Sequence, residues 1–303
     1  MDPIVLYAIP FFVLTMLGEW RLLRRLRQGA GYTGRDTAAS LSMGVGYLVI
    51  AGAAALATVP LYMWLSGYAF FDLSGFWWTW PLLIVLEDLC YYWYHRCSHE
   101  VRVLWASHVN HHSSRHYNLS TALRQSWTTS LTGWVFWVPL VLLGFPVELI
   151  LLQKALNLLY QYWIHTESVG RIGPLEWVLN TPSHHRVHHG RNLRYLDRNY
   201  GGIFIIWDRL FGTFEPERDE EPVEYGLIHQ LDSHNPVVIA FHEWKALFRD
   251  IARRPARALE YLFRPPGWQP DGRSETVPEL LARQQAMESA PANPPEPVPD
   301  PAE

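Results

Sequence analysis

The sequence predicts an all-α fold, an integral membrane helical bundle with a histidine-rich helical cap on its cytosolic side. Three observations lead to this expectation. Several apolar runs are about as long as the roughly 20 residues that a bilayer-spanning helix needs. Tryptophan and tyrosine stand near the ends of these runs, as they do at membrane–water interfaces. Nine of the 14 histidines fall into two short blocks beside apolar runs.

Length, composition, net charge and cysteine count limit the folds and partners that this chain can have. The chain has 303 residues, 49% of them hydrophobic, which suffices for one large domain or two ordinary ones. Its net charge of −4 provides no basic field, so nucleic acid is not expected as a partner. The two cysteines, Cys90 and Cys97, would lie about 10 Å apart along a helix, too far for a disulfide.

We expect five membrane spans, at 3–20, 37–65, 76–94, 127–143 and 147–164. The second and fourth contain no charged residue over 29 and 17 residues, which disfavours the alternative of buried helices in a soluble protein. Gly144-Phe145-Pro146 turns the last two spans into a hairpin. Because the first limb of this hairpin is short, a re-entrant hairpin remains open.

Arginines orient the bundle. Arg21, Arg24, Arg25 and Arg27 follow the first span and place the next loop in the cytosol. Alternation of the spans then brings the residues after 94 and after 164 to that same side. The first span lacks a basic leader and a small-residue cleavage site, so we expect it to be a retained anchor.

The chain is expected to divide into two parts. Residues 1–264 form one membrane-embedded domain, whose cap comprises 95–126 and 165–216. From 265 to 303 proline, glutamate and alanine dominate, which predicts a disordered tail.

The histidines are spaced as metal ligands on helix faces. Residues i, i+3 and i+4 of a helix share one face, and imidazole is the commonest protein ligand of metals. Eight histidines follow this spacing in three sets: His95 and His99; His108, His111 and His112; and His185, His188 and His189. These are too many for one four-coordinate ion and therefore predict two ions side by side.

Two further histidines need separate treatment. His165 ends the last span and is the expected ninth ligand, with a membrane-boundary histidine as the alternative. His184 would point about 100° away from His185 and is expected to support the ligands rather than bind metal. Isolated histidines are usually surface or core residues, but three spaced sets in one chain favour a metal site.

Two carboxylates are candidate catalytic residues. Asp88 lies seven residues before His95 and shares its face, so we expect its carboxylate to hold an imidazole N–H. The alternative is a charge at the end of a span. Glu100 follows His99 directly and is expected either to bridge or orient the ligands or to be a solvated face residue.

The ligand set leaves several chemistries open. Two divalent ions among neutral imidazoles need anionic bridges such as hydroxide or carboxylate. The HExxH signature of zinc proteases is absent. Imidazole suits both iron and zinc, so residues alone do not choose between them. A metal transporter would need ionisable groups deep within the spans, whereas these histidines cluster at one mouth.

Longer motifs add a family resemblance. The three histidine sets, with Asp88 before them and Asn199-Tyr200-Gly201 after them, resemble the membrane fatty acid hydroxylase/sterol desaturase superfamily. Within it, the alkylglycerol monooxygenase branch is similar over about 80–216. The matching segments are Trp105–His108, His111–Ser114, Tyr117–Ser126, Trp163–Glu167, Asn180–Asn192 and Trp207–Glu215.

The resemblance implies a non-haem di-iron monooxygenase that hydroxylates a lipid C–H bond, in this branch beside the ether oxygen of an alkylglycerol. It also implies an external reductant, either tetrahydrobiopterin or an electron-transfer partner, since no dinucleotide fingerprint is present. Hydroxylation or desaturation of a sterol, carotenoid or fatty acyl chain is the sibling alternative, and a zinc hydrolase a more distant one. Motif matches make Arg124, Gln125, Asn118 and Arg191 candidates for cofactor or substrate contacts.

Overall fold

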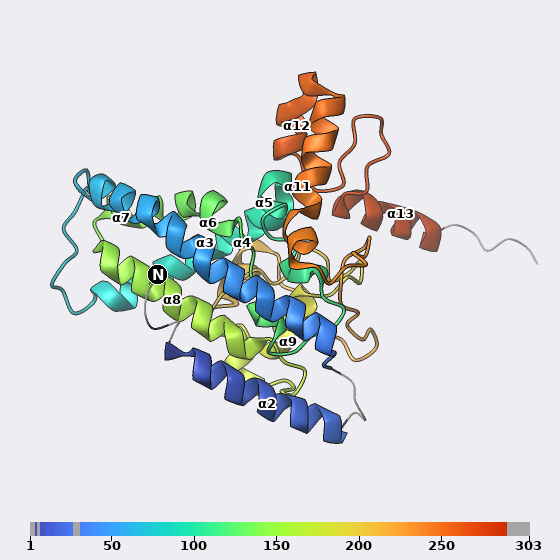
Figure 1. The fold of residues 1–303 in the computed structure, drawn as a ribbon, viewed down its shortest axis with the longest axis horizontal. Helices are drawn as coiled ribbons and strands as arrows, with labels where there is room; N and C mark the ends of the chain where they lie inside the picture. The colour runs from blue at the N-terminus through green and yellow to red at the C-terminus, as the bar shows by residue number, and fades with distance from the viewer. Residues whose placement is uncertain (1–3, 5–6, 27–30, 290–303) are drawn as a thin grey trace, which may run out of the picture.

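The computed structural model describes residue 4 and residues 7–26 and 31–289. Every named element in this part of the chain is a helix, and the only β-type pairings recorded there are three isolated bridges. The predicted all-α class is therefore confirmed. Figure 1 shows long helices on one side of the molecule and a region of short helices and loops on the other.

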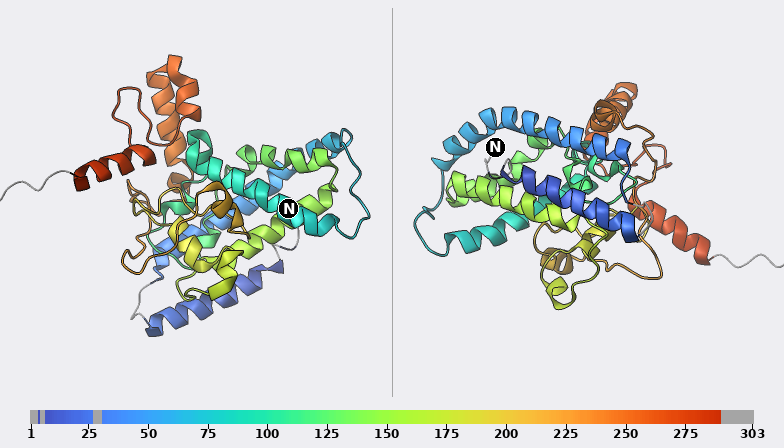
Figure 2. Two further views of the ribbon diagram at one scale, coloured as in Figure 1. Left: turned by 180° about the vertical axis from the view of Figure 1, so that it is seen from behind. Right: turned by 60° about the horizontal axis from the view of Figure 1, so that its bottom comes forward.

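Four long helices form the bundle. They are α2 (Ile9–Leu26), α3 (Gly34–Ser66), α4 (Thr79–Glu100) and α8 (Val147–Ile164). Figures 1 and 2 show α8 between α2 and α3, while α4 packs against α8 from behind. Their bounds follow the expected spans, with α2, α3 and α4 extending beyond them by several residues at one or both ends.

The expected span at 127–143 is wrong as a continuous helix. The structure divides it into α6 (Thr129–Thr132), the 3₁₀ turn η3 (Trp134–Trp137) and α7 (Val138–Leu143). Gly133 separates the first two pieces, and Pro139 lacks the N–H that a helix interior requires. A run without charges predicted apolar surroundings here but not helical continuity.

The turn between α7 and α8 depends on Gly144. Its φ of +99° is left-handed, and a Cβ at this position would lie 1.8 Å from the carbonyl oxygen of Phe71. The glycine thus ends α7 and lets the 67–78 connection pass directly over the turn. This contact fixes the start of α8 relative to α3 and α4.

Only α3, among the described residues, is both long and apolar enough to cross a bilayer by the test of length and hydropathy. Just 6% of its most apolar window is buried inside the molecule. Most of its exposed side chains are apolar, among them Val45, Val49 and Leu56. Exposed apolar surface of this kind is typical of sites that contact a membrane or another protein.

The histidine-rich regions consist of short elements linked by turns. They are α5 (Arg102–Trp105), η1 (His111–Ser113), η2 (Thr121–Leu123), η4 (Gly173–Trp177), α9 (Pro182–His188) and α10 (Ile206–Phe211). A buried carboxylate of the bundle joins two of these regions. Glu19 on α2 accepts hydrogen bonds from Leu119 N at 2.8 Å, from Tyr32 Oη at 2.5 Å and from Thr166 Oγ1.

The C-terminal part is α11 (Pro236–Arg253), η5 (Pro255–Arg257), α12 (Ala258–Phe263) and α13 (Val277–Ser289). Helix α13 lies inside the segment expected to be a disordered tail. Pro278 stands in its first turn, and strong helix formers follow, including Leu280, Leu281 and Ala282. Residues 290–303 of the expected tail lie outside the described residues, and the division at 265 stays a prediction.

Candidate metal centre

The structure brings all nine predicted ligands together in two adjacent groups. Within each group, one ligand atom of every residue lies within 4.8 Å of the others. The first group is His95, His99, His108, His112 and His188, and the second is His111, His165, His185 and His189. The rings of His112 and His189 stack at 4.4 Å between centroids and join the two groups.

Ring nitrogens approach as closely as ligands of a shared ion do. In the first group His108 Nε2 lies 3.0 Å from His95 Nε2 and 3.1 Å from His112 Nε2. In the second group His165 Nε2 lies 3.2 Å from His111 Nε2 and 3.0 Å from His185 Nε2. Two nitrogens bound to one ion at about 2.1 Å lie roughly 3.0 Å apart at a right angle and roughly 3.4 Å apart in a tetrahedron.

Three kinds of local structure position these rings. His95 and His99 sit on one face of α4, and His185 and His188 on one face of α9, as their spacing predicts. The expectation of a helix over 108–112 is wrong: this stretch is a series of turns that ends in the 3₁₀ turn η1. The tighter turn nevertheless places its three rings into both groups.

Backbone carbonyls fix the orientation of several imidazoles. Nδ1 of His95 lies 2.8 Å from Tyr200 O, and Nδ1 of His188 lies 2.9 Å from Arg198 O. Nδ1 of His165 lies 2.6 Å from Gln161 O. A carbonyl oxygen only accepts, so each Nδ1 carries the proton and each Nε2 presents a lone pair to the centre.

Unpartnered nitrogens provide a direct test of fit to metal ions. Nε2 of His99, His188 and His189 is buried and has no hydrogen-bond partner. A buried nitrogen lone pair without a partner costs free energy of folding. Without a bound metal ion, this cost would fall on several imidazoles that crowd into the same two small volumes. An ion in each group would satisfy them, so the residues present fit a dinuclear metal centre.

Burial favours the neutral form of five of these imidazoles. It lowers the pKa of His111 to about 4, and it lowers the pKa of His108, His112, His188 and His189 well below the ordinary value of 6.5. Neighbouring imidazoles lower these values further, since two positive charges would repel at such distances. Neutral imidazole is the form that binds metals.

Asp88 holds no imidazole, so that part of the prediction is wrong. Its carboxylate accepts hydrogen bonds from Ile203 N at 2.6 Å, Phe204 N at 3.0 Å and Trp207 Nε1 at 3.0 Å. The i+7 spacing placed Asp88 on the correct face of α4, but the 200–207 segment fills the space beside His95. Asp88 therefore supports His95 indirectly, through the segment that contains Tyr200.

The other predicted residues lie at different distances from the centre. Glu100 belongs to neither group; it is 43% exposed and pairs with Arg96 at 2.9 Å. His184 also lies outside both groups, packed against Phe214. Arg124 is buried in an ion pair with Asp36, while its own carbonyl oxygen lies 3.4 Å from His111 Nδ1.

Of the four residues expected to contact substrate or cofactor, which are Asn118, Arg124, Gln125 and Arg191, three do not line the main cavity. Asn118 is buried and donates to Gly31 O, which ties its loop to the start of α3. Arg191 forms a half-exposed ion pair with Glu224 at 2.9 Å. Gln125 alone of these four residues lines the main cavity described below.

Sequence reasoning missed a clamp around the 197–201 loop. Asp208 accepts hydrogen bonds from Tyr200 N at 2.7 Å and Gly201 N at 2.8 Å, and burial raises its pKa to about 6. Asp197 Oδ1 lies 3.4 Å from His99 Nδ1. Asp197 and Asn199 both have φ of 56°, a strained backbone in which Asp and Asn are enriched. The Asn199-Tyr200-Gly201 signal pointed at this loop without revealing its role.

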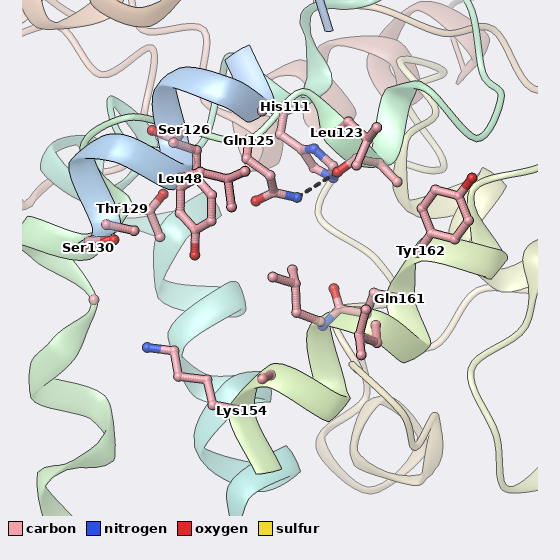
Figure 3. Close-up of a pocket in the computed structure, with 18 of the residues that line it drawn as sticks. Leu48, His111, Leu123, Gln125, Ser126, Thr129, Ser130, Lys154, Gln161 and Tyr162 are labelled. Carbon is pink, nitrogen blue, oxygen red and sulfur yellow. Dashed lines mark hydrogen bonds between the residues drawn. The ribbon is translucent and has the colours of Figure 1, made fainter. Parts of the chain in front are cut away.

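A largely apolar cavity of about 730 Å³ ends at the histidines. Its walls come from α2, α3, α8 and the 122–137 segment, and His108, His111 and His165 line one end. Figure 3 shows Lys154 and His111 on opposite sides of it, with Gln125 and Gln161 between. Along α8 it extends from Glu148 to His165, which is about 26 Å by the helical rise.

Residues 80–213 match the family model described as fatty acid hydroxylase. Over this stretch the chain is similar to that family. The match begins with α4, encloses all nine histidines of the two groups and ends just after α10. The expected resemblance is thereby confirmed, and the matched stretch contains the candidate metal centre together with most of the cavity wall.

Individual relatives extend the similarity beyond the matched stretch. Alkylglycerol monooxygenase of Homo sapiens is 44% identical over 242 residues, covering 77% of this chain and 53% of that protein. That of Danio rerio is 44% identical over 239 residues, covering 76% and 52%. Ornithine lipid hydroxylase of Rhizobium tropici is 34% identical over 142 residues, covering 45% and 43%.

This chain spans about half the length of the alkylglycerol monooxygenases that it matches. No solved structure matches it.

Proposed function

We propose that this chain is a membrane-bound di-iron monooxygenase that hydroxylates the carbon beside the ether oxygen of an alkylglycerol. The observation that carries the proposal is the junction of cavity and metal centre. His108, His111 and His165 belong to the two imidazole groups and also line the end of a long apolar cavity. A lipid chain in this cavity would present one of its carbons to both ions.

The similarity to alkylglycerol monooxygenases supports the choice of substrate. Cavities of about 300–1,000 Å³ are typical of small-ligand sites, and this one is long and mostly apolar. A single alkyl chain with a small polar head suits such a shape. Two chains side by side would need a wider space.

The proposal includes a multi-pass membrane location with the metal centre on the cytosolic side. Helices α2, α3, α4 and α8 would lie in the bilayer, and the pieces at 129–143 would complete a re-entrant hairpin with α8. The outward apolar surface of α3 and the arginines after α2 support this arrangement.

Two iron ions, when bound, supply the activation of O2 and the removal of hydrogen from a C–H bond. One oxygen atom enters the lipid as a hydroxyl, and the other leaves as water with two electrons and two protons from an external reductant. The hydroxylated carbon then carries two oxygens, so its bond to the ether oxygen breaks. The products are a long-chain aldehyde and glycerol.

The chain itself would bind and orient the lipid and exclude water. The nine imidazoles of the two groups would hold the two ions. Gln125 donates Nε2 to Ala122 O at 2.7 Å, which leaves its carbonyl oxygen as an acceptor for a lipid hydroxyl. The reductant would come from outside, as tetrahydrobiopterin or as an electron-transfer partner.

Incubation of the purified, iron-loaded chain with an alkylglycerol, tetrahydrobiopterin and O2 tests the proposal. We expect long-chain aldehyde and glycerol in equal amounts, and none without O2 or with zinc in place of iron. Aldehyde formed without O2, or metal analysis showing zinc in an active preparation, would contradict a di-iron oxygenase.

Relatives with other lipids favour one second candidate, hydroxylation or desaturation of an acyl chain or sterol. The ornithine lipid hydroxylase and a Delta(7)-sterol 5(6)-desaturase of Aspergillus fumigatus, 29% identical over 145 residues, match the chain more weakly. Mass spectrometry of products from an acyl lipid and a sterol would decide: a gain of one oxygen or a loss of two hydrogens there, without alkylglycerol cleavage, would replace the leading proposal.

A further inference from the structure

Helix α11 shows three distinct faces, only one of which packs on the rest of the molecule. Ile239, Ala240 and Leu247 are buried, and the first two contact Ala39 and Met43 of α3. The acidic residues of α11 also point inward. Arg102 of α5 donates Nε to Glu243 at 2.9 Å and Nη2 to Asp250 at 2.7 Å.

A second face of α11 is apolar, and all of it except the half-buried Trp244 is exposed. Val237, Phe241, Trp244 and Phe248 recur at i, i+4, i+7 and i+11, the spacing of one helical face. Phe248 is 58% exposed and Val237 55% exposed. The start of α11 packs on Ala39 and Met43 of α3, and the neighbouring α3 residues Leu41 and Val45 are exposed.

The third face is basic. Lys245, Arg249 and Arg253 follow one another at four-residue spacing and are exposed. Since both acidic residues of α11 are bound by Arg102, the outward charge of this helix is entirely positive. Helix α12 continues the apolar surface with exposed Leu259 and Phe263.

The α11–α12 hairpin projects from the bundle in a fixed direction (Figures 1 and 2). Arg102 clamps it through the two carboxylates and stacks on Tyr261 of α12 at 5.8 Å. Trp244 Nε1 donates to Thr128 Oγ1 at 3.1 Å. A rigid arm with adjacent apolar and basic rows has the pattern of a helix that lies in the membrane–water interface.

We infer that α11 lies in the surface of an anionic bilayer, with Val237, Phe241 and Phe248 inserted and Lys245, Arg249 and Arg253 at the headgroups. The charge partition points to anionic lipid, because a neutral surface gives no reason to direct every acid inward and every base outward. The inference shares the proposed membrane location of α3 but does not depend on the reaction.

Fluorescence quenching on the full chain in lipid nanodiscs tests this placement. A bimane label would be attached at Phe248→Cys, with both native cysteines replaced by alanine. Labels at Val45→Cys on α3 and at Asp271→Cys, in a loop far from α3, would serve as bilayer and solvent references. Quenchers would be brominated lipid and aqueous iodide.

We expect the label at 248 to be quenched by brominated lipid and protected from iodide, as at 45 and opposite to 271. Quenching at 248 by iodide alone, with 45 still quenched by lipid, would overturn the inference and leave the membrane location intact. Lack of lipid quenching at both 45 and 248 would overturn both. Protection from both quenchers at 248 would indicate a protein contact and overturn the inference as well.

A second experiment varies the charge of the lipid. Adding phosphatidylserine to phosphatidylcholine discs should increase lipid quenching at 248, and Lys245→Glu should remove about half or more of that increase. Arg273→Glu, a charge reversal away from α11, should leave it unchanged. An increase that is equal in both variants would contradict a role for the basic row.

Discussion

Three imidazoles of the metal centre are held by backbone oxygens rather than by carboxylates. His95, His165 and His188 each lie within 3 Å of a carbonyl through Nδ1. The spacing of the histidines predicted which rings meet, because helix geometry determines that. It did not predict the carbonyl partner of His95, because Tyr200 returns to the site from 105 residues further along the chain.

His188→Ala should lower bound metal by about one ion per chain and abolish turnover, because it removes a lone pair from the first group. The matched control is His184→Ala, since this buried histidine lies outside both groups and should keep its metal. Metal analysis of the two purified variants checks this. Equal metal contents would remove His188 from the ligand set.

Asp88→Asn should weaken metal affinity by roughly 10–100-fold while the chain stays folded. The asparagine would keep one acceptor but turn an N–H toward the donors of Ile203 and Phe204. The 200–207 segment, and with it the carbonyl that orients His95, would then shift. Competition with a coloured chelator measures the affinity, and a value equal to wild type would limit Asp88 to stability.

Helices and turns were predictable where an apolar run of sufficient length ended at glycine or proline residues that favour a turn. The uncharged run in α3 and the turn at Gly144–Pro146 gave helices close to the observed bounds. The run at 127–143 failed because apolar composition reports burial and not backbone conformation. Likewise HxxHH at 108–112 matched a helix by spacing, but a 3₁₀ turn can bring the same rings inward.

Gly46 of α3 allows the 122–128 segment to pass close to the helix. A Cβ there would lie 2.3 Å from Trp127 Nε1, which donates to Met43 O at 3.0 Å. Gly46→Ala should therefore lower stability by about 1–3 kcal/mol through overpacking. Gly52→Ala, on the same helix with nothing within 4 Å, should be neutral or stabilising. Thermal unfolding in detergent compares the two, and equal midpoints would contradict this reading.

The whole molecule couples protonation to folding through the buried imidazoles. For His111 the pKa falls from 6.5 to about 4 on folding, so the folded state binds fewer protons than the unfolded chain between these values. Stability of the metal-free protein should therefore fall as pH drops from about 6.5 to about 4, by about 1.4 kcal/mol per pKa unit for each such group. Unfolding midpoints across this range provide the check; midpoints that rise toward acid would contradict it.

Filling the cavity should impair the binding of the lipid substrate without changing the iron content of the protein. Ala55→Trp would fill space between α3 and α8 and should lower kcat/KM for a long alkylglycerol about ten-fold or more, a change of about 1.4 kcal/mol. Ala53→Trp points outward on the same helix and should have little effect. Iron content should be unchanged in both. A loss of activity in both variants would point to general disruption of α3.

The buried carboxylate of Glu19 has a consequence for how the protein is made. Its partners Leu119 and Thr166 are 100 and 147 residues further along the chain. At synthesis rates of about 5–20 residues per second, the first helix waits roughly 7–30 s before the last of these partners leaves the ribosome. Tyr32 and Leu119 reach Oε2 of Glu19 earlier, but Oε1 lacks its Thr166 donor until then, so the packing of the 165–168 region against α2 is completed late in the biogenesis of this chain.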